Sequence, residues 1–301
     1  QYNMVTNDES NFLWNWIFPT KKVMKKKGKI YSLGKQGMQI IDHSVSSNGA
    51  LHKINFEVKE RDLYELQNYG FYADVMAEEV QNPDAPIDAQ RDKLALLRSI
   101  HNLTKESQAV ALAFDPAFNP NNVALGAGQQ FSDPASDPYA TFIDLRRQSK
   151  LLSGRYPNKL AITQDGIDAL SVHPSIIARY APTVTVTQSM VEELLMKDFK
   201  FEEIKIVDTL AWSGDADIDG GTFSFIQDAK MLMFFSSNEE FLKPLSYGHT
   251  YTREDTRVWT VEADPRTRKI EKIVSSVGVD DEYQFVVTNQ DAGFLVTDIV
   301  A

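Results

Sequence analysis

The 301-residue sequence contains no cysteine. This absence excludes disulfides, thiolate nucleophiles and cysteine-ligated metal sites, and it fits folding in a reducing cytoplasm. Long apolar runs are also missing, because stretches such as 231–235 are far too short to span a bilayer. The first ten residues lack the basic and apolar regions of a signal peptide. We therefore expect no membrane partner.

Positive charge is scarce, with 31 basic against 42 acidic residues and a net charge of −11. Sequence-independent binding of nucleic acid requires clustered Lys and Arg, so a chain this acidic is a poor candidate for it. Length and an ordinary hydrophobic content of 43% predict one large domain or two.

Residues 1–27 have the composition of an arm. An aromatic cluster that includes Trp14 and Trp16 is followed by a basic run that includes Lys25, Lys26 and Lys27. The run predicts contact with nucleic acid or with acidic groups of a neighbouring copy, and a solvated charged turn is an equally weighted alternative. On an acidic protein, an apolar-then-basic arm favours packing against a second copy.

Residues 28–70 show apolar and polar residues in alternation. Ile54, Phe56 and Val58 alternate with polar residues, which is typical of a strand with one solvated face. Asn48-Gly49 supplies a tight turn between this strand and the apolar stretch 38–45. Because an isolated two-stranded hairpin is marginally stable, we expect this one to rest on a neighbouring subunit.

A long helix is expected from about residue 87 to 114, capped by Asp84 or Asp88 and ended before Pro116. Its predicted apolar stripe follows a four-three spacing and comprises Leu96, Ile100, Leu103, Val110 and Phe114. We expect this helix to lie across a sheet, with His101 as a partly buried packing residue beside the stripe.

Strands and helices alternate after residue 150. The pattern predicts strands at 160–163, 204–207 and 230–235, a helix at 164–172, and a helix that a capping box at 189–192 opens. It also predicts a hairpin of strands 257–261 and 269–274. In the tail, strands 283–287 and 294–300 are expected to pair back into the sheet of this region.

The strongest candidate for chemistry is the series Asp215, Asp217 and Asp219, which precedes a glycine as in a calcium loop. Position twelve of that loop requires a Glu and is Ile226 here, so an exposed acidic turn is the preferred interpretation. The five histidines lack metal-ligand spacing, and no nucleophile elbow or phosphate loop is present. His173, which precedes Pro174, is interpreted as part of a helix stop. We therefore predict no catalytic residue, metal or cofactor, and no enzymatic activity.

The segment 126–180 contains a distinctive series of short motifs: 131–134 (FSDP), 137–138 (DP), 157–158 (PN), 169–170 (AL) and 173–174 (HP). Another motif, 291–295 (DAGFL), lies near the end of the chain. With these motifs, the sequence closely resembles the major capsid proteins of tailed bacteriophages. The resemblance implies an α+β fold of the tailed-phage capsid type with six parts. These are an N-terminal arm (1–27), an extended hairpin loop (28–70), a peripheral domain with a long spine helix (71–149), an apical α/β domain (150–249), peripheral return strands (250–278) and C-terminal apical strands (279–301).

The resemblance also implies a structural role, namely self-assembly through pentamers and hexamers into an icosahedral head around double-stranded DNA. Implied partners are further copies, a scaffolding protein, a portal and a decoration protein, and the implied location is the virion, assembled in the host cytoplasm. Inter-subunit contacts are expected at Trp14, Trp16, the lysines 25–27, Ile54, Phe56 and Val58. Some family members join subunits by a Lys–Asn isopeptide bond, but no Asn or activating acid here matches that pattern.

Two alternatives remain open from the sequence. An encapsulin-type compartment shell uses the same fold and requires an inner surface for cargo. A soluble metal-dependent enzyme would use Asp215, Asp217 and Asp219.

Overall fold

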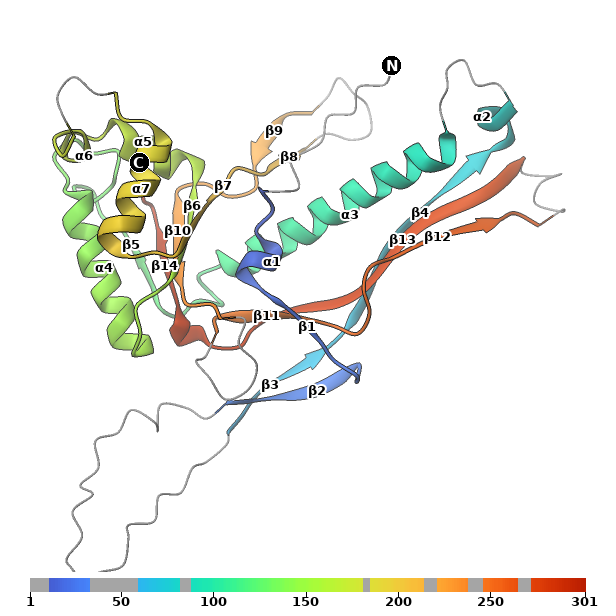
Figure 1. The fold of residues 1–301 in the computed structure, drawn as a ribbon, viewed down its shortest axis with the longest axis horizontal. Coiled ribbons are helices and arrows are strands. Elements are labelled where there is room, and N and C mark those ends of the chain that lie inside the picture. The colour runs from blue at the N-terminus through green and yellow to red at the C-terminus, as the bar shows by residue number, and fades with distance from the viewer. Residues whose placement is uncertain are drawn as a thin grey trace, which may run out of the picture.

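The computed structural model describes residues 11–32, 59–81, 88–180, 185–213, 221–237, 246–264 and 272–301. Within these residues, two five-stranded sheets and two separate two-stranded hairpins are present. Figure 1 shows one lobe in which several helices gather around a sheet, and a long, narrow extension in which a long helix runs beside paired strands. This mixture of helices with mainly antiparallel sheets confirms the predicted α+β class.

The first sheet has the strand order β5-β14-β10-β6-β7. Its strands are β5 (Asn122–Ala124), β14 (Gly293–Thr297), β10 (Lys230–Phe234), β6 (Lys159–Thr163) and β7 (Glu203–Val207). The central strand β10 is antiparallel to both β14 and β6, whereas β6 pairs with β7 in parallel. The strands expected at 160–163, 204–207 and 230–235 are thereby confirmed.

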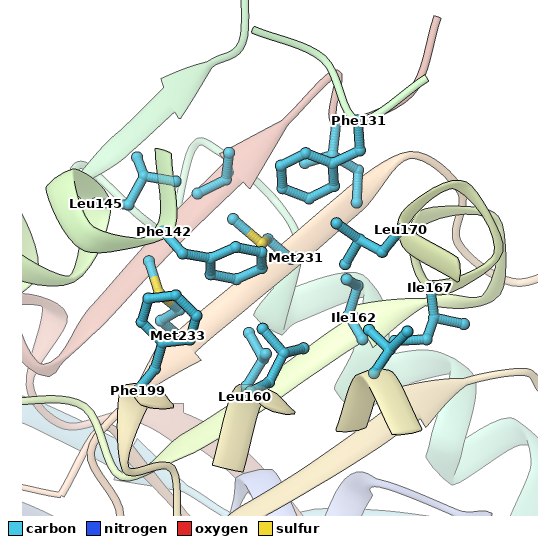
Figure 2. Close-up of a cluster of buried hydrophobic side chains, with 14 of the residues drawn as sticks. Phe131, Phe142, Leu145, Leu160, Ile162, Ile167, Leu170, Phe199, Met231 and Met233 are labelled. Carbon is cyan, nitrogen blue, oxygen red and sulfur yellow. The ribbon is translucent and has the colours of Figure 1, made fainter. Parts of the chain in front are cut away.

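Four helices cover one face of this sheet: α4 (Pro138–Ser153), α5 (Gln164–Val172), α6 (Pro174–Ile177) and α7 (Gln188–Phe199). Alternate strand residues such as Met231 and Met233 point toward them and pack with Phe142 and Phe199 (Figure 2). The helix α5 has the predicted bounds, and His173 ends it. The same imidazole accepts the Ser175 N–H at the start of α6, which confirms its role in a helix stop.

The opposite face of the sheet packs against two other helices, α1 (Trp14–Ile17) and the C-terminal end of α3 (Ala89–Ala113). Leu232 and Phe234, which alternate with the methionines of β10, belong to this second cluster. The segment before β1 therefore contributes directly to the core of the helical lobe.

The second sheet builds the extension. It has the order β1-β11-β13-β12, and β4 pairs along the other edge of β13. The strands are β1 (Thr20–Lys22), β11 (Gly248–Thr252), β13 (Ile273–Val287), β12 (Arg257–Glu262) and β4 (Gln67–Met76). The helix α3 lies along this sheet and buries Leu97 against Val75, Val277 and Val279 (Figure 1).

The remaining elements are short. A hairpin pairs β2 (Lys27–Ser32) with β3 (Lys59–Glu65), and another pairs β8 (Leu210–Trp212) with β9 (Phe223–Phe225). The helix α2 (Ala77–Gln81) follows β4, and the 3₁₀ turn η3 (Gln290–Ala292) precedes β14.

The long helix is confirmed, and Asp88 caps it by accepting the Arg91 N–H at 3.2 Å. Of the predicted stripe, Val110 and Phe114 are buried as expected, whereas Leu96 and Ile100 are exposed. The buried positions of the helix are Leu97, His101, Lys105, Glu106, Ala109, Val110 and Ala113. The prediction failed in part because the buried face also includes charged residues, which an apolar pattern cannot reveal.

Two further expectations are wrong. Residues 283–287 do not join the sheet of the helical lobe, because they form the end of β13 and pair with β11. Only the second strand of the tail, β14, enters that sheet. The helix α7 begins at Gln188 with Thr187 at the N-cap position, so the capping box expected at 189–192 is not formed.

Candidate inter-subunit site

The helix α1 is held in place by a carboxylate from α3. Its N-cap residue, Leu13, has no side chain that could accept a hydrogen bond. Glu106 is fully buried and replaces this cap: its two oxygens accept the Leu13 N–H at 2.9 and 2.8 Å, and one accepts the Trp14 N–H at 2.8 Å. Glu106 thus satisfies donors that every helix start leaves unpaired.

Burial raises the pKa of Glu106 to about 7, although the two backbone N–H donors and Lys205 act in the opposite direction. The carboxyl group therefore exchanges its proton near neutral pH.

The neighbouring residue on α3, Lys105, fixes the indole of Trp14. Its ammonium group lies 4.2 Å from the Trp14 ring centroid and 4.4 Å from that of Tyr283. The same group donates to Asp281 Oδ2 at 2.7 Å. Burial works to raise the pKa of Asp281, but the contacts with His101 and Lys105 outweigh it and hold this pKa below its ordinary value. His101 is fully buried in this cluster, rather than partly buried as expected.

Trp16 is also bound within its own chain. Its ring packs edge-on against Phe234 at 5.1 Å, and its indole N–H donates to Glu203. The Lys159 ammonium lies 4.9 Å from the same ring. Both tryptophans remain partly exposed.

Within the predicted arm, residues 11–18 pack against their own chain. Leu13, Ile17 and Phe18 are fully buried in the core of their own chain. Residues 1–10 lie outside the described part of the chain. Contact of Trp14 and Trp16 with a neighbouring copy stays a prediction.

The basic run lies between β1 and β2, and acidic groups of the same chain pair with part of it. Lys26 lies 3.2 Å from Glu282, and Lys27 lies 2.5 Å from Glu65. Lys25 is exposed. Contacts of these three lysines with a neighbour also stay a prediction.

The pairing of β2 with β3 forms the described part of the segment 28–70. Tyr64 of β3 stacks on Tyr251 of β11 with ring centroids 4.8 Å apart, and the adjacent Leu66 is buried. This contact attaches the hairpin to the second sheet. The predicted contact residues Ile54, Phe56 and Val58 lie outside the described residues.

The described residues offer little support for a catalytic or metal-binding site. No group of three or more His, Asp or Glu side chains is placed to hold a metal ion there. Asp215, Asp217 and Asp219 lie outside the described part. No described helix is both long and apolar enough to cross a bilayer.

Glu106, Lys105 and Asp281 were missed by sequence reasoning. The only local signal was a Lys-Glu pair in the middle of a helix, which normally indicates a solvated face. Their partners lie 93 and 176 residues away along the chain, so no local pattern could have connected them.

Comparison with known proteins gives matches in structure alone. No family model matches the chain, and no curated protein matches it. A solved structure described as a phage-related protein from Bordetella bronchiseptica RB50 is similar with a TM-score of 0.72 at 23% identity, covering 97% of this chain and 94% of that one.

Two other solved structures are similar at lower scores. The capsid structure of the cyanophage P-SCSP1u has a TM-score of 0.53 at 12% identity, covering 93% of this chain and 86% of that one. A virus-like particle from Pyrococcus furiosus has a TM-score of 0.51 at 11% identity, covering 93% and 90%. Because these matches span both chains almost completely, the shared feature is the whole architecture and not a single motif. The chain has the α+β fold of bacteriophage capsid proteins.

Proposed function

We propose that this chain is the major capsid protein of a tailed bacteriophage and assembles into an icosahedral head around double-stranded DNA. The observation that carries the proposal is the match to a cyanophage capsid structure, which covers 93% of this chain. Its role is structural, and this role involves no enzymatic activity. Fold alone does not establish function, so surfaces that suit self-association supply the second argument.

Those surfaces are abundant on the extension. One helix packs on one face of three strands, no described element packs on the other face, and Tyr72 and Val261 are largely exposed there. Large apolar residues exposed in groups mark interaction sites on soluble proteins. Many weak contacts of this kind become strong in a closed shell, because each copy is held by several neighbours at once.

The acidic composition fits the proposed container. A net charge of −11 disfavours tight binding of phosphates by the wall, so packed DNA can be released. Pentamers and hexamers, a scaffolding protein, a portal and a decoration protein are the partners that this function entails, and the virion, assembled in host cytoplasm, is its location.

The test is the size of the purified protein. We expect particles far larger than the 34 kDa chain in light scattering and electron microscopy, with nuclease-protected DNA in particles from infected cells. A 34 kDa monomer that never assembles, even with a co-expressed scaffold, would refute the proposal. Protein-loaded particles in cells without a phage would indicate a compartment shell instead.

The metal-enzyme alternative has its own control. Replacing Asp215, Asp217 and Asp219 together by Asn should leave particle formation intact under the capsid proposal. Loss of a catalytic activity in that variant, with an intact monomer, would favour the enzyme.

A further inference from the structure

Basic side chains gather around Tyr156, just after the C-terminal end of α4. Residues 145–164 hold five basic residues and no acidic residue. The Arg146 guanidinium and the Lys150 ammonium each lie 4.2 Å from the centroid of the Tyr156 ring. Arg155 lies 5.7 Å from the ring centroid of Phe235, which follows β10. These three cations form a basic cluster at the end of the first sheet where β6 begins and β10 ends.

No carboxylate within the described part of the chain pairs with the basic cluster. The Nε atom of Arg146 is buried there without a hydrogen-bond partner, and burial lowers the pKa of this guanidinium while Tyr156 acts in the opposite direction. A partly buried cation without a counter-ion is stabilised by a carboxylate from outside the chain. Nearby acids bind other groups of their own chain: Glu203 pairs with Lys159 at 3.2 Å, and Glu202 and Asp144 accept hydrogen bonds from Asn158 and Gln148.

The opposite end of the same sheet is acidic. Asp165 lies just after β6, Asp228 precedes β10, and Asp298 follows β14. Because β10 is antiparallel to both β6 and β14, these three positions lie at one end of the sheet. Asp165 also accepts the Ala229 N–H at 2.7 Å, beside Asp228. With Asp168, which is one turn further along α5, the three aspartates form the acidic end.

The acidic end has no cationic partner among the described residues. Asp168, Asp228 and Asp298 are exposed, and none of the four aspartates forms an ion pair there. Two basic side chains on neighbouring segments have other contacts: Lys230 donates to the Phe114 carbonyl oxygen at 3.2 Å, and Arg179 lies 3.4 Å from the Tyr139 ring centroid. The five-residue strands β6 and β10 separate the two ends by roughly 15 Å. One copy therefore cannot bring its own two charged ends together.

We infer that the basic cluster of one copy binds the acidic end of a second copy. The occupant is a second copy because every copy carries both complementary surfaces, at opposite ends of one sheet. The contact joins two different surfaces and is therefore head-to-tail, and such a contact closes into a ring when its rotation allows it. Complementary charge guides the encounter of the two lobes and sets their register. The inference rests on the proposed function and assigns one of its interfaces.

Charge reversal in the assembling protein tests the contact. One variant reverses the basic cluster by Lys150→Glu and Arg155→Glu. A second reverses the acidic end by Asp168→Lys and Asp228→Lys. Each variant places like charges at the contact, so the threshold protein concentration for particle formation in light scattering should rise about tenfold or more. All four changes in one chain restore opposite charges and should return the threshold close to its parental value.

A matched control reverses two exposed lysines of the extension, Lys22→Glu and Lys272→Glu. It changes the net charge as much as the first variant does, and its threshold should stay close to the parental value. Thermal denaturation of the unassembled variants checks that each one folds. The neutral pair Lys150→Gln and Arg155→Gln replaces a reversal that does not fold, and it should raise the threshold by a smaller factor.

Parental thresholds in both reversed variants, or no recovery in the chain with all four changes, would overturn the inference and leave the proposed function standing. An effect of the basic-cluster reversal without any effect of the acidic-end reversal would assign the cluster to another anion, such as double-stranded DNA, and would also overturn it. Absence of particles from the parent protein would overturn both the inference and the proposed function.

Discussion

Glu106 provides the sharpest test of the physical reasoning, because it is an acid buried under a short helix that it caps. The perturbation is Glu106→Gln, which keeps the size of the side chain and removes its charge. The ordinary pKa of the group is 4.5, and burial raises it to about 7 in the folded chain. Between these values the folded protein keeps a proton that the unfolded chain has lost. The free energy of unfolding therefore falls as pH rises from 4.5 to 7 and is then constant.

The interval between the two pKa values corresponds to about 3 kcal/mol, of which about 2 kcal/mol falls between pH 5 and pH 8. The Gln variant lacks this ionisation. Its free energy of unfolding should therefore improve relative to the parent by about 2 kcal/mol when pH is raised from 5 to 8. Urea denaturation of unassembled protein at both pH values, followed by tryptophan fluorescence, measures the difference.

Glu193→Gln is the matched control, because this glutamate is exposed on α7 and forms an ion pair with Lys197. It should change stability by no more than about 0.5 kcal/mol at either pH. Glu106→Ala tests the cap itself. It leaves the buried N–H groups of Leu13 and Trp14 without an acceptor and should cost about 2 to 4 kcal/mol at both pH values. A difference between parent and Glu106→Gln that stays constant from pH 5 to pH 8 would refute the assigned titration.

Three further predictions concern other buried groups. Lys105→Met leaves the carboxylate of Asp281 buried without its cation and should lower the free energy of unfolding by about 3 to 5 kcal/mol. In a double-mutant cycle, adding Asp281→Asn to the same chain should restore most of this loss. Burial lowers the pKa of His249 from 6.5 to about 4. Between these pH values the unfolded chain is protonated at His249 and the folded chain is not, so the free energy of unfolding falls as pH is lowered from 6.5 to 4. His249→Gln should therefore lose less stability than the parent as pH falls from 6.5 to 4, as measured by thermal denaturation. A side chain at Gly278 would overlap the ring of Trp259, so Gly278→Val should lower stability by about 1 to 3 kcal/mol in urea denaturation, and an unchanged midpoint would contradict the packing.

Local patterns predicted elements well where neighbours along the chain define them. The helix α5 has the expected bounds because a strand ends at Thr163 and His173-Pro174 stops the following turn. The strands β6, β7 and β10 are short apolar segments bounded by polar residues, and all three were anticipated.

Local sequence patterns failed where contacts between residues distant in the sequence determine the structure. β13 runs unbroken through 15 residues because β4 pairs along one edge and β12 and β11 share the other, whereas the sequence suggested separate strands. The predicted α3 stripe is wrong at Leu96 and Ile100, which are exposed, and right at Val110 and Phe114, which are buried.

Trp14 and Trp16 were predicted to contact a neighbouring copy, and this stays a prediction. Within the chain they contact Lys105, Phe234 and Glu203, all distant in the sequence.

By itself, the sequence determined the long helix α3, the helix α5 and the strands β6, β7 and β10, together with the absence of thiol chemistry and the resemblance to a capsid family, because these depend on residue types and short spacings. Only the tertiary structure decided which side of α3 is buried and which residues secure the N-terminal segment. The physical reason is that a buried charge is tolerated only with partners, and the partners of Glu106 and Lys105 come from Leu13 and Asp281, far away in the sequence.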